Sequence, residues 1–293
     1  MDKIHRFLID ESNVRGEVVQ LEASWQALIA TTDYPAPVRQ MLGEAYAAVA
    51  LLSATIKYKG TLVVQVNGGK PLNLLVVQST SEGHLRGMAR WSDDVDVSCV
   101  PATVEAMFGS DATLVITVQP EEGQGERYQS IVNLEGDTLS KCLTAYFEQS
   151  EQLQTRLELA VGEKSVAGLL VQKLPGEAKD ADGWNRASML AETIRHDELL
   201  DLNVEVILNR LFNQEVVRLF KGDELSFKCS CSQQKVEDML IGLGKDEASE
   251  TMKEQGSISV DCDFCNTNYT IDEVDLARIF SESVIPPASD SLH

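Results

Sequence analysis

Apolar and polar residues alternate with a period of two over several short segments in the first 175 residues, and turn residues separate these segments. The strands that this pattern predicts are 61–67, 72–78, 84–91, 112–119, 127–134, 156–161 and 168–174. Helical spacing of apolar residues predicts a long helix over 38–56 and a second helix over 138–151, which Asp137 can cap. Consecutive strands with short turns and occasional helices predict an α+β fold, in which helices pack on an antiparallel sheet.

The pattern changes after residue 175. A polar stretch from Pro175 to Gly183 interrupts it, and residues 184–220 then read as helical and dense in apolar side chains. We therefore predict an α+β core domain over 1–175, a helical linker over 176–226 and a small C-terminal domain over 227–293. If the apolar face of the linker packs on the core domain, undocking would expose both surfaces, and large exposed apolar patches mark protein-binding sites.

Four of the six cysteines lie in the last quarter of the chain, as Cys229-Ser230-Cys231 and Cys262-Asp263-Phe264-Cys265. Two close pairs of thiols are typical of a tetrahedral zinc site, in which each pair grips the metal from one turn. We predict one Zn²⁺ per chain in the reduced state, with Cys229, Cys231, Cys262 and Cys265 as ligands. Cys99 and Cys142 stand alone, and we expect them to be small core or partly buried residues with a structural role.

The spacing of the first pair also allows a strained disulfide between Cys229 and Cys231, so the site suits both a metal-bound and an oxidised state. The segment around the thiols has few apolar anchors, and a unit of about 60 residues is only marginally stable without a bound metal or a disulfide. A structural zinc contributes roughly 10–16 kcal/mol to such a unit. Loss of the metal on oxidation is therefore expected to unfold it. The expected anchors are Phe227, Met239, Leu240, Ile241 or Leu243, Ile258, Val260, Phe264, Tyr269, Ile271, Val274, Leu276, Ile279 and Phe280.

Composition narrows the classes of function. The chain is 43% apolar and 24% charged, as in ordinary globular proteins, but its net charge of −21 disfavours binding to nucleic acid or to anionic membranes. Acids outnumber bases by fifteen to six over residues 221–293, which argues against a nucleic-acid-binding zinc ribbon. We find no targeting or membrane-spanning segment, so we expect a cytoplasmic protein with reduced thiols. No phosphate-binding or hydrolase motif is present, and we do not expect an enzyme.

The order of these features resembles the redox-regulated holdase chaperones of the thirty-three-kilodalton heat-shock protein family, and the resemblance covers nearly the whole chain. The matching segments are His5-Arg6-Phe7-Leu8, Asn13-Val14-Arg15-Gly16-Glu17, Tyr34-Pro35, Pro37-Val38, Ala54-Thr55-Ile56-Lys57, Leu134-Glu135-Gly136-Asp137-Thr138-Leu139, Tyr146-Phe147, Ser150-Glu151-Gln152-Leu153, Phe227-Lys228-Cys229-Ser230-Cys231-Ser232 and Cys262-Asp263-Phe264-Cys265.

The resemblance implies a holdase that uses no ATP and that is compact, zinc-bound, monomeric and largely inactive when reduced. It implies that oxidants form disulfides Cys229–Cys231 and Cys262–Cys265, with release of zinc and unfolding of the C-terminal domain and the linker. It further implies a homodimer that binds unfolding client proteins until reduction allows their transfer to ATP-driven foldases.

Two other hypotheses stay open from the residues alone. The first is a thiol–disulfide oxidoreductase that uses Cys262 and Cys265, although no thioredoxin-like context precedes this pair. The second is an interaction module that zinc holds permanently folded, with no redox role. The first predicts turnover without Cys229 and Cys231, and the second predicts indifference to peroxide.

Overall fold

The computed structural model of the chain describes residues 2–121, 123, 125–176 and 178–282. The chain divides into two compact units between Lys228 and Cys229, which we call unit 1 and unit 2. The expected α+β fold with antiparallel sheets is confirmed. The domain boundaries at residues 175 and 226 stay predictions, and part of the predicted C-terminal domain, residues 283–293, lies outside the described residues.

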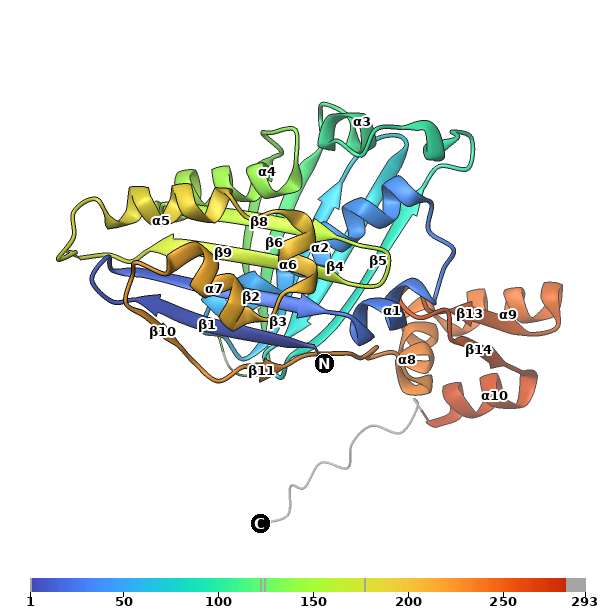
Figure 1. Cartoon of the computed structure of the whole chain (residues 1–293). Coiled ribbons are helices and arrows are strands. Elements are labelled where there is room, and N and C mark those ends of the chain that lie inside the picture. Colours follow the sequence, from blue (N-terminus) through green and yellow to red (C-terminus); the bar gives the residue numbers. More distant parts are fainter. Residues whose placement is uncertain (1, 122, 124, 177, 283–293) are drawn as a thin grey trace, which may run out of the picture. The chain divides into compact units, whose positions relative to one another are not determined.

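Unit 1 contains two sheets (Figure 1). The first sheet has the strand order β10-β1-β2-β9-β8, and β11 also pairs with β1. Its strands are β1 (Lys3–Ile9), β2 (Val14–Leu21), β8 (Thr155–Val161), β9 (Val166–Lys173), β10 (Val217–Leu219) and β11 (Asp223–Glu224). The sequence pattern did not predict β1 or β2. Strand β2 is buried on both faces and therefore lacks an alternation of apolar and polar residues, and β1 carries three apolar residues in succession, Phe7, Leu8 and Ile9.

The second sheet has the order β12-β5-β4-β3-β6-β7. Its strands are β3 (Gly60–Asn67), β4 (Leu72–Thr80), β5 (His84–Trp91), β6 (Thr113–Pro120), β7 (Tyr128–Asn133) and β12 (Ser226–Phe227). All neighbouring strands in it are antiparallel except β12, which runs parallel to β5. The seven strands predicted in the first 175 residues of the chain are all confirmed, with ends within two residues of those observed.

The helix α2 (Ala36–Thr55) lies between the two sheets and contacts strands of both. It is buried on nearly every side, which requires the small and apolar residues that fill this stretch. Three shorter helices complete this part of unit 1: α1 (Ala23–Ile29), α3 (Val104–Phe108) and α4 (Leu139–Tyr146). The helix predicted over 138–151 has the expected extent but changes type, because α4 ends at Tyr146 and a π-helical turn, Phe147–Glu151, follows before Gln152 adopts a left-handed conformation.

The helices α5 (Gly183–Glu192), α6 (His196–Asp201) and α7 (Val204–Phe212) pack on the other face of the first sheet. Strand β9 contributes side chains to a core on each face of the first sheet. Its Val166 and Leu170 belong to the core around α2, whereas Leu169 and Val171 belong to a separate core under α5–α7. The helical pattern predicted up to residue 220 is therefore wrong after Phe212, where the chain turns and continues as β10.

Unit 2 contains α8 (Gln233–Leu243), α9 (Lys245–Gln255), the hairpin of β13 (Ile258–Asp261) and β14 (Asn268–Ile271), and α10 (Glu273–Glu282). Several expected anchors are wrong, since Met239, Ile241, Leu243 and Val274 are exposed. The described buried apolar residues are Val236, Leu240, Ala248, Met252, Ile258, Ile271, Leu276 and Ile279. A core of this size is too small to hold a unit of this length by itself.

The carboxyl group of Glu17 lies inside unit 1. Glu17 on β2 is 2% exposed, and its Oε2 atom has no hydrogen-bond partner. Burial raises the pKa of Glu17 to about 7, although the nearby charges of Arg15 and Arg6 favour the ionised form. The folded chain therefore retains a proton here that the unfolded chain has already released, so this group lowers stability as the pH rises from 4.5 to about 7.

We predict that Glu17→Gln stabilises the chain relative to the wild type as the pH rises. The difference in the free energy of unfolding should increase by up to about 3 kcal/mol from acid to mildly alkaline pH, because the variant has no charge to bury. Urea unfolding of both proteins under reducing conditions, over a series of pH values, measures this difference. A difference that does not change with pH would contradict the prediction.

Candidate metal centre

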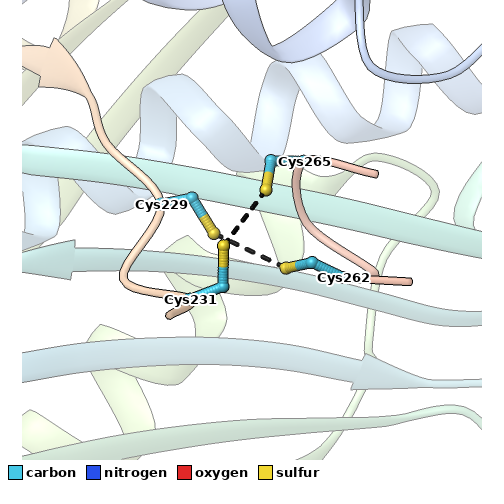
Figure 2. A group of neighbouring side chains, drawn as sticks. All are labelled: Cys229, Cys231, Cys262 and Cys265. Atoms are coloured by element: carbon cyan, nitrogen blue, oxygen red, sulfur yellow. Dashed lines mark hydrogen bonds between the residues drawn. The ribbon is translucent and has the colours of Figure 1, made fainter. Parts of the chain in front are cut away.

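The four cysteines of the two close pairs converge in unit 2 (Figure 2). All four Sγ atoms lie within 4.8 Å of one another. Between the two pairs, the Sγ atoms of Cys229 and Cys262 lie 3.6 Å apart, and those of Cys231 and Cys265 lie 3.4 Å apart. The structure thus brings together every residue for which the sequence predicts a metal-binding role.

The first pair lies on the turn that precedes α8. Ser232 caps this helix, since its Oγ accepts a hydrogen bond from the backbone N–H of Lys235. The ammonium group of Lys235 folds back and donates to the carbonyl of Ser230 at 2.6 Å and to its hydroxyl at 3.2 Å. The residue between Cys229 and Cys231 is therefore fixed, and a single spacer suffices to aim both sulfurs at one point.

The second pair lies in the loop between β13 and β14. The backbone N–H groups of Cys265 and Asn266 both donate to the carbonyl of Cys262, and the N–H of Cys262 donates to the carbonyl of Thr267. Asn266 adopts a left-handed conformation with φ of 53°, which asparagine tolerates better than most residues. This tight turn holds Cys262 and Cys265 on the same side of the hairpin.

The donor set fits a tetrahedral thiolate metal. With metal–sulfur bonds of about 2.3 Å, the sulfurs of a tetrahedral zinc site lie about 3.8 Å apart. The approaches of 3.4 and 3.6 Å are close to this spacing. Each thiol is only partly buried, so the cluster lies near the surface of unit 2 and within reach of small reactants.

The four thiols differ in acidity. Burial opposes ionisation of Cys265, but hydrogen bonds from the hydroxyl and backbone N–H of Thr267 and from Cys231 lower the pKa of this thiol to about 7. Burial and the neighbouring thiols raise the pKa of Cys262 to about 12. One thiolate therefore forms readily, whereas four adjacent thiolates need a cation between them.

Tyr269 is a member of the site that the sequence identified only as an apolar anchor. Its hydroxyl lies 3.2 Å from Cys231 Sγ and donates a hydrogen bond to it. Burial raises the pKa of the Cys231 thiol, and this hydrogen bond acts in the opposite direction. No local motif marks Tyr269, because its contact with Cys231 depends on the way the hairpin faces the first turn.

The two remaining cysteines lie in unit 1. The expected burial is wrong for Cys99, which is exposed at the end of a short 3₁₀ turn, with its sulfur 3.6 Å from a carboxylate oxygen of Asp96. Cys142 is buried, and burial raises the pKa of its thiol to about 11, which keeps it protonated. Neither belongs to the four-thiol cluster.

The chain is thus a protein of two units. An α+β unit with two sheets is followed by a small unit that holds four convergent thiols. The model of the Hsp33 protein family matches residues 2–272 of the chain. The chain is 46% identical to the 33 kDa chaperonin of Nitrosococcus oceani and 44% identical to that of Methylobacillus flagellatus, and each match covers 100% of this chain and 99% of the relative. The chain therefore belongs to the Hsp33 family of chaperones.

The fold of a solved structure agrees with this assignment. The crystal structure of the 33 kDa chaperonin from Thermotoga maritima matches with a TM-score of 0.79 at 21% identity, over 96% of this chain and 99% of that chain. The relatives are named for a chaperone role, which is not enzymatic. Among the described residues, no helix combines the length and the apolar character that a membrane crossing requires.

We predict that Tyr269→Phe weakens metal binding without abolishing it. Loss of the hydroxyl removes a hydrogen bond that orients the Cys231 sulfur, and changes of this kind cost about 10–100-fold in metal affinity. Competition with a chromophoric chelator under reducing conditions measures the dissociation constant. Tyr128→Phe, at an exposed position on β7, is the control and should bind as the wild type does. Equal affinities of all three proteins would exclude a role for Tyr269.

Proposed function

We propose that this protein is a redox-regulated, ATP-independent holdase chaperone that is inactive while its four clustered thiols bind a metal. The main support for the proposal is the four-thiol cluster in a unit with a small apolar core. The metal is proposed to be one Zn²⁺ per chain, since thiolate sulfur in a tetrahedral set of four favours zinc. Ligands would be Cys229, Cys231, Cys262 and Cys265, which require a reducing compartment, so we place the protein in the cytoplasm.

Oxidation is proposed to act on the ligands themselves. Four thiolates and two molecules of hydrogen peroxide, with four protons, give two disulfides and four molecules of water, and the chain then releases its metal ion. Following the family resemblance, we propose the disulfides Cys229–Cys231 and Cys262–Cys265. Their formation is compatible with a cluster in which all four Sγ atoms lie within 4.8 Å of one another.

Loss of the metal is expected to unfold unit 2. A structural zinc contributes roughly 10–16 kcal/mol, more than the net stability of many whole domains. The eight described residues of its core cannot replace this contribution. A redox event at the thiols thus becomes an unfolding event.

The unfolding is proposed to spread into residues 176–226. These residues include α5, α6 and α7, which cover one face of the first sheet. Undocking of the three helices would uncover an apolar surface on β1, β2, β8 and β9, formed by Phe7, Ile9, Val14, Val18, Ala160, Ala167, Leu169 and Val171. An apolar surface of this kind can bind unfolding client proteins, and its exposure is consistent with a homodimer in the oxidised state.

The net charge of −21 fits this role. An activated holdase exposes apolar surface, and mutual repulsion between strongly charged molecules limits their aggregation and keeps client complexes dissolved. The change from the inactive to the active state needs no nucleotide, because the oxidant supplies the energy for activation.

One experiment tests the proposal directly. Bound zinc and the suppression of aggregation of a heat-denatured test protein are measured on the reduced chain and again after peroxide at about 40 °C, a temperature that favours local unfolding. We expect about one zinc per chain before oxidation and its release as suppression appears. Zinc that stays bound, or that is lost without suppression, would contradict the proposal and leave a structural metal module.

We predict that Cys229→Ser weakens zinc binding and unfolds part of unit 2 even under reducing conditions. The variant keeps three thiolates, so its affinity should fall by more than the about 10–100-fold expected for loss of a supporting hydrogen bond. Zinc titration and circular dichroism measure both effects. Cys99→Ser and Cys142→Ser are matched controls outside the cluster, and both should keep the zinc content and the response to peroxide of the wild type. A wild-type affinity in Cys229→Ser would exclude the four-thiolate site.

A further inference from the structure

Residues 216–228, which we call the edge strap, cover an edge strand in each sheet of unit 1. Strand β10 lies antiparallel to β1, with Leu219 opposite Phe7 and Val217 opposite Ile9. Further along, β11 pairs with the start of β1, and β12 pairs with β5. The strap therefore forms the outermost strand at one edge of each sheet. It lies next to β1 in the first sheet (Figure 1) and next to β5 in the second.

The backbone hydrogen bonds of the strap show which groups it satisfies on β1. The N–H of Phe220 donates to the carbonyl of Arg6 at 2.9 Å, and the N–H of Asp10 donates to the carbonyl of Val216 at 3.2 Å. Without the strap, these groups of β1 would lie on an open sheet edge. An open edge is a template for the addition of another extended chain.

The strap is held weakly in comparison with the strands inside the first sheet. Strand β10 has three residues, whereas β1 and β2 pair over seven positions. Its ion pairs, from Arg218 to Asp10 and from Arg6 to Asp223, lie at the surface, where such pairs contribute about 0–1 kcal/mol. Val216 and Phe220 are exposed. The other apolar side chains of the strap are only partly buried: Val217, Leu219, Leu225 and Phe227.

The strap also ends next to the thiol cluster along the chain. The N–H of Lys228 donates to the carbonyl of Leu85 at 3.0 Å, and the next residue is the candidate ligand Cys229. A metal bound by Cys229, as proposed above, would hold the chain one residue beyond this hydrogen bond. When unit 2 unfolds, the strap loses that anchor.

The strap itself shows what kind of chain the edge accepts. Val217 and Leu219 pack against the apolar core under α5–α7, while Arg218 between them pairs with Asp10 at the surface. Gly222 passes close to the ring of His5, where a Cβ atom would lie 2.5 Å from the nearest ring atom. The edge of β1 thus accepts an extended segment with apolar side chains at every second position.

We propose that the edge of β1, once the strap leaves it, binds an extended apolar segment of an unfolded client as an added antiparallel strand. In the reduced chain the strap occupies this edge in place of the client. This inference rests on the proposed function, because it names the surface that the oxidised chain offers to its clients. Backbone hydrogen bonds supply affinity for any sequence, and the alternating apolar positions select for segments that a folded protein would bury.

Three synthetic peptides of residues 215–225 test the proposal on the full-length oxidised protein. The first is unmodified. The second carries an N-methyl group at Phe220, which removes the donor that bonds to Arg6 in the strap. The third carries an N-methyl group at Leu219, whose N–H points away from β1 because Leu219 occupies the non-hydrogen-bonded position between Arg218 and Phe220. All three keep the same side chains.

We expect the unmodified peptide to bind the oxidised chain at least about tenfold more tightly than the reduced chain, in which the strap competes with it. N-methylation at Phe220 should weaken binding about tenfold, as loss of a backbone hydrogen bond in a strand pairing does, and N-methylation at Leu219 should change it by less than about twofold. Saturating unmodified peptide should abolish suppression of client aggregation. Fluorescence anisotropy and light scattering measure the two effects.

Three results would overturn the edge proposal while leaving the proposed function intact. Equal weakening by both N-methyl groups would show that the peptide does not bind as a strand on β1. Binding of the peptide without loss of client suppression would place the clients elsewhere. Dissociation of an oxidised homodimer by the peptide, with client suppression intact, would identify a second copy of the chain as the occupant. An oxidised chain that never suppresses aggregation overturns the proposed function, and the edge proposal with it, before any peptide is added.

Discussion

The packing of α5, α6 and α7 on the first sheet decides how much apolar surface unit 1 exposes. It buries a second apolar face of strands whose other face already packs on α2. Because strand β9 is buried on both faces, the sheet cannot remain fully solvated on one side as many antiparallel sheets do. The helices that cover it therefore decide whether this apolar surface is part of a core or part of the molecular surface.

Unit 2 differs from unit 1 in what stabilises it. Unit 1 has an extensive apolar core around α2 and long strand pairings, so its two sheets can stay folded while α5–α7 move. Unit 2 has one small core and a cluster of four thiols. Under the proposed function, chemistry at the thiols changes the stability of the smaller unit and leaves the larger unit as a rigid support for clients.

The sequence predicted those features that have a local signal. Alternation located the strands of the second sheet, and the spacing of Cys229, Cys231, Cys262 and Cys265 located the thiol cluster. It missed β1, in which Phe7, Leu8 and Ile9 are apolar in succession, and β2, which is buried on both faces, because neither strand shows a plain alternation. It also extended a helix through Val217–Leu219, because strand β10 is specified by its pairing with β1. The role of Tyr269 and the burial of Glu17 also depend on contacts that are distant in sequence.

Amide hydrogen exchange on the reduced and the oxidised chain tests whether release of zinc uncovers the first sheet. The zinc content of the same samples is measured alongside. We expect amides of α5, α6, α7 and of residues 216–228 to lose protection as zinc is released. Amides of α2, which lies between the two sheets, should keep theirs. Full protection of α5–α7 in a zinc-free chain that suppresses aggregation would contradict the account, since client binding would then need no uncovering of the first sheet.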